Sequence, residues 1–186
     1  MTQFLYRPIS TRVANVLART RISPLAVTWT GAAVALAGAV LLAGGYYVAG
    51  AAVTLAAVIV DCVDGDLARA TDRSSTVGAF LDSVLDRWMD AALVLGLVYS
   101  DVDDLAVVGG LALTASLLTS YTRARAQSLG ADCPEGIGGR DSRILILVVA
   151  AVAGMAWWGL LLVAVTGFVT SIQRAALAAK RLGSLP

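Results

Sequence analysis

The chain has 186 residues, of which 58% are hydrophobic, and its formal net charge is +1. A soluble domain of this length is usually about 45–50% apolar, so the composition is typical of a membrane protein. Histidine is absent, which excludes histidine-based catalysis and histidine-ligated metal. The two cysteines, Cys62 and Cys133, lack the spacing of a zinc site, and the arginine-containing first residues predict no signal peptide.

Residues 1–22 are predicted to form a juxtamembrane amphipathic helix. Between residues 3 and 20, apolar side chains recur at helical spacing and the arginines fall elsewhere; these apolar residues are Phe4, Leu5, Ile9, Val13 and Leu17. Such a helix can lie in the membrane interface, although a solvated N-terminal helix would show the same spacing. Pro24 then marks the start of the next helix.

Long apolar stretches follow in chain order. The first four predicted spans cover residues 27–43, 47–68, 77–99 and 105–126, with Gly44 and Gly45 forming the first turn. Residues 144–170 are compatible with one long tilted helix or with two helices that turn near residues 154–158. Because a span needs about 20 residues, two spans fit if the fifth starts near Ile137 and the sixth ends near Leu177.

The distribution of positive charge decides between five and six spans. With six, all 14 lysines and arginines fall on one side, which the positive-inside rule makes cytoplasmic. With five, the three cations of the C-terminal tail would lie on the other side. We therefore predict an all-α membrane protein with a single domain over residues 1–186. Six transmembrane helices occupy residues 23–180, in a cell membrane, with both termini and the active site facing the cytoplasm.

Aspartates gather in the predicted cytoplasmic halves of the second and third spans. Asp61 and Asp64 are three residues apart and share one helix face, and Asp82 and Asp86 form a stripe four residues apart on the next helix. A hairpin with its loop at residues 69–76 would bring the two sets together. Clustered carboxylates repel one another unless cations hold them, and an all-oxygen site suits Mg²⁺, Mn²⁺ or Ca²⁺.

Three interpretations of these membrane carboxylates follow from the residues alone. Ionisable groups inside apolar spans are expensive, so they indicate a functional site, here metal-dependent catalysis. The same groups are also compatible with a cation or proton transport path. A third possibility is structural neutralisation by Arg69 or Arg87.

The spacing of the acidic residues resembles a known signature. The string Asp61-x2-Asp64-Gly65-x2-Ala68-Arg69-x8-Gly78-x3-Asp82-x3-Asp86 matches every fixed position of the CDP-alcohol phosphotransferase signature. The resemblance implies a six-helix membrane enzyme of phospholipid biosynthesis. Such a transferase passes a phospho-alcohol group from a CDP-linked alcohol, usually a CDP-linked lipid, to the hydroxyl of a second alcohol and releases CMP.

The resemblance also implies roles for individual residues. Two divalent cations, Mg²⁺ or Mn²⁺, would be held by Asp61, Asp64, Asp82 and Asp86, and Asp86 would serve as the general base. The CDP site would comprise Asp61, Asp64, Gly65, Ala68, Arg69 and Gly78. Asp66 and Asp90 fall outside the signature, and we expect a solvated loop residue and a structural residue respectively.

The acceptor is indicated by more limited similarity. Residues 120–126 and 136–143 look like the corresponding stretches of the phosphatidylinositol-phosphate synthase branch, which implies that Arg123, Arg140 and Arg174 hold the phosphate of inositol phosphate. The branch usually has lysine at the first of these places. The alternative is that these arginines satisfy the positive-inside bias or touch lipid headgroups.

Other substrates remain open. Residues 6–12 and 22–24 look like the transferase domain of di-inositol-phosphate-phosphate synthases, which use CDP-inositol. Leu25 stands where that group usually has asparagine, and the fused cytidylyltransferase domain is missing from this chain. Glycerol 3-phosphate is a further acceptor compatible with an arginine cluster. The resemblance implies a homodimer surrounded by membrane lipids, with no nucleic-acid partner.

Overall fold

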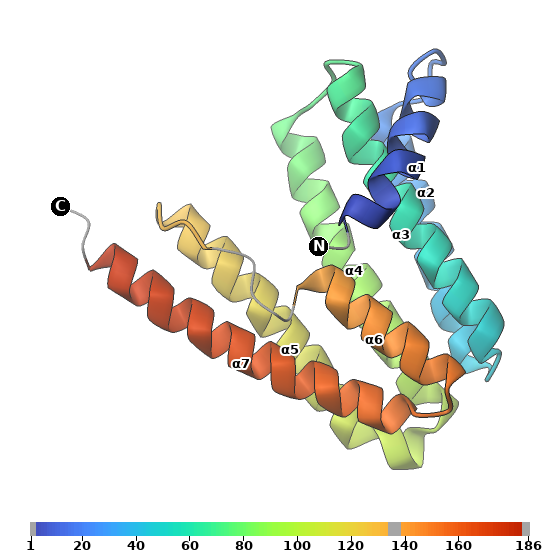
Figure 1. Cartoon of the computed structure of the whole chain (residues 1–186), viewed down its shortest axis with the longest axis vertical. Helices are drawn as coiled ribbons and strands as arrows, with labels where there is room; N and C mark the ends of the chain where they lie inside the picture. The colour runs from blue at the N-terminus through green and yellow to red at the C-terminus, as the bar shows by residue number, and fades with distance from the viewer. Residues whose placement is uncertain (1–2, 134–138, 184–186) are drawn as a thin grey trace. The chain divides into compact units, whose positions relative to one another are not determined.

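The computed structural model describes residues 3–133 and 139–183, and all the regular structure in these ranges is α-helical (Figure 1). Seven helices are present in the described ranges: α1 Gln3–Leu17, α2 Pro24–Ala43, α3 Tyr47–Ala70, α4 Thr76–Ser100, α5 Val102–Ser128, α6 Arg140–Val152 and α7 Ala156–Leu182. The predicted all-α class is confirmed, and the break near residues 154–158 separates α6 from α7. The turn between α3 and α4 is shorter than the loop predicted at residues 69–76.

The chain divides into two compact units, residues 1–96 and 97–186, with the boundary inside α4. The single domain predicted from the sequence stays a prediction.

Local signals explain where the helices of the first unit begin and end. Ser23 caps α2 by accepting a hydrogen bond from the backbone N–H of Ala26 at 3.2 Å, and Pro24 occupies the first turn, where a missing N–H does no harm. Gly45 has φ of +79°, a conformation that glycine adopts without strain, so the chain reverses there into α3. Pro24 and the turn at Gly44 and Gly45 were anticipated from the sequence, whereas the Ser23 cap was not.

Small residues let the helices of the first unit approach closely. A Cβ added to Gly38 of α2 would lie 2.7 Å from the Thr54 hydroxyl of α3, and one added to Gly96 of α4 would lie 2.5 Å from the Ala39 carbonyl oxygen of α2. At the opposite end of the α2–α3 hairpin, Ala14 of α1 joins a buried cluster with Val63 and Leu67 of α3. This cluster fixes α1 against the part of α3 that carries the signature.

The second unit is built on α5 and α7, which pack side by side and run in the same direction. The buried Thr119 hydroxyl of α5 donates to the Gly167 carbonyl of α7 at 2.8 Å, and Arg181 near the end of α7 bonds the Asp132 carbonyl just beyond α5. Between α6 and α7, Gly154 has φ of +69°, which reverses the chain. The short α6 then packs antiparallel to α7.

Within the part of the chain that the structure describes, four helices are long and apolar enough to cross a membrane: α2, α3, α5 and α7. The chain is therefore multi-pass in character. The predicted count of six is not confirmed, because α4 carries several charges and α6 has 13 residues, a rise of only about 20 Å against a hydrocarbon core of about 30 Å. The predicted start of the fifth span near Ile137 lies outside the described residues.

Candidate active site

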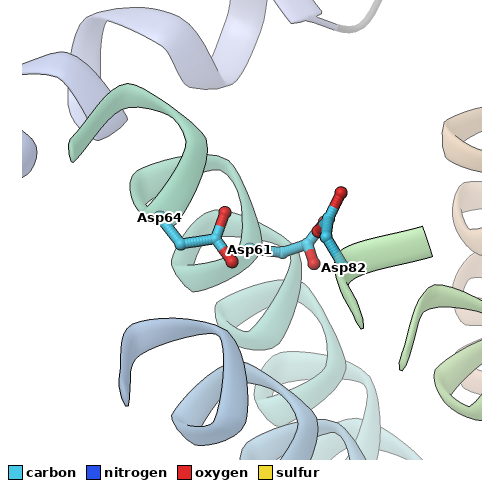
Figure 2. Close-up of side chains that lie close together, drawn as sticks. All are labelled: Asp61, Asp64 and Asp82. Atoms are coloured by element: carbon cyan, nitrogen blue, oxygen red, sulfur yellow. The ribbon is translucent and has the colours of Figure 1, made fainter. Parts of the chain in front are cut away.

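Three of the four signature aspartates converge. Asp61 and Asp64 project from one face of α3 and Asp82 projects from α4, and one carboxylate oxygen from each lies within 4.8 Å of the others (Figure 2). Asp64 is only 6% exposed, and its Oδ2 is buried without a hydrogen-bond partner. A buried carboxylate oxygen with no donor, beside two further carboxylates, is a donor set suited to a hard divalent cation. The residues present therefore fit the metal that the family signature implies.

Asp86 lies one helical turn beyond Asp82 on α4 but does not belong to this three-carboxylate group. Its Oδ2 lies 3.2 Å from NH1 of Arg87, which also donates to the Ser83 carbonyl at 2.8 Å. The sequence left open that Arg87 neutralises one of the aspartates. In the structure Arg87 pairs with Asp86, which lies outside the three-carboxylate group.

A cavity of about 460 Å³ opens beside the carboxylates. All four residues expected only at the CDP site, Gly65, Ala68, Arg69 and Gly78, line this cavity together with Asp64 and Asp82. The hairpin predicted from the sequence thus brings the glycines, the arginine and the two aspartates to one surface.

Sequence reasoning missed several residues that line the same cavity. They come from the start of α2 and from the α3–α4 turn: Ser23, Pro24, Leu25, Thr28, Arg73, Ser74 and Ser75. The Ser75 hydroxyl accepts a hydrogen bond from the Gly78 N–H at 3.0 Å, so the first turn of α4 faces the cavity. Pro24 marked a helix start in the sequence, but only the packing of α2 on α3 places that start beside the cavity.

The expectation for Asp66 was wrong. Asp66 lies within α3, not in a solvated loop, and its side chain is 16% exposed. It accepts a hydrogen bond from the Ser10 hydroxyl at 2.6 Å and pairs with NH2 of Arg69 at 2.6 Å. Asp90 is 7% exposed in α4, in keeping with a structural residue.

The three arginines expected at the acceptor phosphate lie in the second unit. Arg174 of α7 is 5% exposed and donates from NH1 to the Thr119 carbonyl of α5 at 2.8 Å. Arg123 lies one turn beyond Thr119 on the same helix, half-buried, and Arg140 is the first residue of α6. Arg143, buried in α6 at 4% exposure, was not anticipated. Part of the 136–143 stretch, residues 136–138, lies outside the described residues.

Comparison with known proteins identifies the class. Residues 21–179 match the model of the CDP-alcohol phosphatidyltransferase family, and the chain therefore belongs to this family of membrane transferases. Membership favours an enzyme over the transport path that the carboxylates alone left open.

Two relatives indicate which members of the family the chain resembles. The chain is 36% identical, over 91% of its length and 90% of the relative's, to archaetidylinositol phosphate synthase of Methanothermobacter thermautotrophicus. It is 39% identical, over 83% of its length but 37% of the relative's, to a bifunctional IPC transferase and DIPP synthase of Rubrobacter xylanophilus.

Solved structures of one further relative agree in fold. Phosphatidylinositol phosphate synthase of Mycobacterium tuberculosis with CDP-DAG bound matches with a TM-score of 0.86 and 29% identity, covering 96% of this chain and 98% of that one. The same enzyme in complex with manganese and citrate matches with a TM-score of 0.86 and 28% identity, covering 95% and 92%.

Proposed function

We propose that this enzyme transfers the phosphatidyl or archaetidyl group of a CDP-linked lipid to a hydroxyl of inositol phosphate and releases CMP. The observation that carries the proposal is the cavity itself, because two of the three clustered aspartates, Asp64 and Asp82, and every signature residue assigned only to CDP line one space of about 460 Å³. The names of the relatives supply the acceptor: the archaeal relative is an archaetidylinositol phosphate synthase and the mycobacterial one a phosphatidylinositol phosphate synthase.

The aspartate cluster is assigned to metal. Asp61, Asp64 and Asp82 would hold two divalent cations, Mg²⁺ or Mn²⁺, with Asp86 as a further ligand. When bound, the cations would neutralise the diphosphate and stabilise the departing phosphate of CMP. The manganese complex of the mycobacterial relative supports this assignment.

Donor binding and proton transfer are assigned to residues of this chain. Gly65, Ala68 and Gly78 leave room for the donor to approach the helix backbones, and the Arg69 guanidinium binds a phosphate oxygen. Asp86 accepts the proton of the attacking hydroxyl as its oxygen approaches the β-phosphorus. The neighbouring Arg87 holds the Asp86 carboxylate by one oxygen, so its orientation is fixed before the acceptor arrives.

The acceptor's own phosphate is assigned to Arg123, Arg140 and Arg174. Burial favours this assignment for Arg174, because a guanidinium that is 5% exposed neither serves a positive-inside bias at the surface nor touches lipid headgroups. The carbonyl of Thr119 accepts a hydrogen bond from NH1 of Arg174, and the buried Nε of the same guanidinium has no hydrogen-bond partner, so Nε could donate to a phosphate oxygen.

We further infer six spans with the active site and both termini in the cytoplasm. Because α5 and α7 run in the same direction, the chain must return between the end of α5 and the start of α7, and α6 lies on that return. Positive residues then all fall on one side. The exposed Ile9, Val13 and Val16 of α1 support a helix lying in the membrane interface, and the bundle is assigned to one domain that forms a homodimer.

A CMP-release screen tests the reaction. The purified protein with Mg²⁺ or Mn²⁺ is given CDP-diacylglycerol, CDP-archaeol or CDP-inositol, each with inositol phosphate, inositol, glycerol 3-phosphate or serine. We expect CMP only when a CDP-linked lipid and inositol phosphate are both present. Asp86→Asn should remove turnover while CDP still binds, and the exposed Asp72→Asn should leave both unchanged. No CMP from any pair would refute the proposal.

One alternative has specific support. The bacterial relative named as a DIPP synthase makes CDP-inositol a reasonable donor, with a phosphorylated inositol as acceptor. Release of CMP from CDP-inositol, and not from the CDP-linked lipids, would select this reaction.

A further inference from the structure

Asp66 stands beside the donor cavity but has no place in the family signature. Its Oδ2 accepts a hydrogen bond from the hydroxyl of Ser10 in α1 at 2.6 Å, and the Thr11 hydroxyl lies 3.4 Å from the same oxygen. Its Oδ1 lies 2.6 Å from NH2 of Arg69, one turn further along α3. One carboxylate therefore joins α1 on one side to a cavity-lining arginine on the other.

The two hydrogen-bond partners of Asp66 differ in their conformational freedom. Ser10 is 0% exposed and is held in the contact between α1 and α3, whereas the Arg69 side chain is 66% exposed. A long exposed side chain loses rotamer entropy when a ligand fixes it. A partner that is itself fixed from the other side can remove part of that loss before the ligand binds.

The position of Arg69 is suited to binding a phosphate in the cavity. Its NH1 would lie 3.5 Å from a Cβ built on Gly65, so the guanidinium extends back along the helix face that lines the cavity. Because Asp66 engages NH2, the donors on NH1 and Nε remain for a phosphate oxygen.

We propose that Asp66 is a positioning residue for the donor: it orients the Arg69 guanidinium toward the diphosphate and is itself oriented by Ser10, so that the docking of α1 on α3 sets the affinity for the CDP-alcohol. This rests on the proposed function, in which Arg69 binds a donor phosphate. The α1 helix thereby acts on substrate binding through Asp66.

A competing role for Asp66 is also physically possible and would have the opposite effect on donor binding. If Asp66 competed with the diphosphate for Arg69, removing its charge would strengthen donor binding. The contact with the buried Ser10 favours positioning, because it prevents the carboxylate from following the arginine and leaves the unused guanidinium donors on the cavity side.

The test compares Asp66→Asn with wild type by CMP release, with CDP-diacylglycerol or CDP-inositol, whichever donor the wild type uses, and by calorimetric binding of CDP alone. We expect the donor KM and the CDP Kd to rise about three- to tenfold, with kcat and the acceptor KM within about twofold, because a ground-state contact is weakened. Asp72→Asn, an exposed acid in the α3–α4 turn, is the matched control and should match wild type. Asp66→Glu should recover part of the loss.

Two further comparisons separate positioning from a structural role. Ser10→Ala should raise the donor KM in the wild-type background but add nothing in the Asp66→Asn background, because Ser10 acts through Asp66. Likewise, Asp66→Asn should have no effect on donor KM once Arg69 is replaced by alanine. Should Asp66→Asn fail to fold, Ser10→Ala alone and combined with Arg69→Ala gives the same comparison.

The inference is overturned if donor KM and CDP Kd fall or stay unchanged in both Asp66→Asn and Ser10→Ala, or if the effects of Ser10 and Arg69 simply add. Its failure is distinguishable from that of the proposed function. A wild type that binds CDP but releases no CMP with any donor and acceptor refutes the function, and the CDP-binding comparison still decides the role of Asp66.

Discussion

Replacing Asp64 with asparagine should stabilise the metal-free protein and remove its response to metal. Asp64 is the buried member of a group of three carboxylates with oxygens within 4.8 Å of one another, and its Oδ2 has no hydrogen-bond donor. Without a cation this arrangement is strained by like charges. Asparagine keeps the shape of the side chain and removes one of the charges.

The size of the effect follows from the spacing. Two full charges 4.8 Å apart repel by about 3.5 kcal/mol at an effective dielectric constant of about 20. Proton uptake and relaxation reduce this figure, so we expect Asp64→Asn to stabilise the metal-free protein by about 1–3 kcal/mol. A cation at 100 times its Kd stabilises the wild type by about 2.7 kcal/mol, and the variant should lose most of that gain.

Thermal unfolding in detergent measures both quantities, once with a chelator and once with Mn²⁺. The variant should unfold at a higher temperature than wild type with the chelator, and the order should reverse with Mn²⁺. The exposed Asp72→Asn controls for the change in net charge and should follow wild type in both conditions. A variant that is less stable than wild type with the chelator, or that keeps the full Mn²⁺ response, would show that the three carboxylates do not form the metal site.

Two further predictions concern packing and the acceptor. Gly96→Ala should destabilise the protein by about 1–3 kcal/mol, because its Cβ would lie 2.5 Å from the Ala39 carbonyl oxygen. Gly110→Ala is the control and should be neutral or stabilising, because Gly110 has open space around it. Equal unfolding temperatures for the two variants would contradict the close contact at Gly96. Arg174→Lys should raise the acceptor KM at least about tenfold with little change in donor KM, since lysine lacks the planar fork with which Arg174 bonds Thr119 and is proposed to bond the acceptor phosphate. Steady-state kinetics with each substrate varied would show the effect, and parallel rises in both KM values would contradict it.

The helices were predictable because the apolar runs and their breaks are local features. The start at Pro24, the turn at Gly44 and Gly45, and the break before Ala156 each depend on the conformational preference of a few adjacent residues. The same holds for the cluster of carboxylates. Asp61 and Asp64 share a face by helix geometry, and a short turn is enough to bring Asp82 opposite them.

Contacts between distant segments were not predictable from the same patterns. The sequence placed Asp66 in a solvated loop because nothing in its surroundings indicates that Ser10, 56 residues away, reaches it. The start of α2 lines the donor cavity for the same reason, since only the packing of α2 against α3 brings Ser23 and Leu25 there. Asp86 was expected within the cluster, but it is not one of the three converging carboxylates, and its Oδ2 pairs with the adjacent Arg87.

The proposed donor site therefore depends on local spacing, whereas the proposed acceptor site depends on contacts between distant segments. The signature residues proposed for the donor and for bond cleavage lie in one hairpin of α3 and α4, between Asp61 and Asp86, where spacing dictates position. The arginines proposed for the acceptor come from α5, α6 and α7, and a contact that holds Arg174 joins residues 55 positions apart. A change of acceptor alcohol can then arise by substitution in the second unit while the hairpin, and with it the phosphoryl chemistry, stays unchanged. Acceptor specificity should accordingly be more variable within the family than the acidic signature.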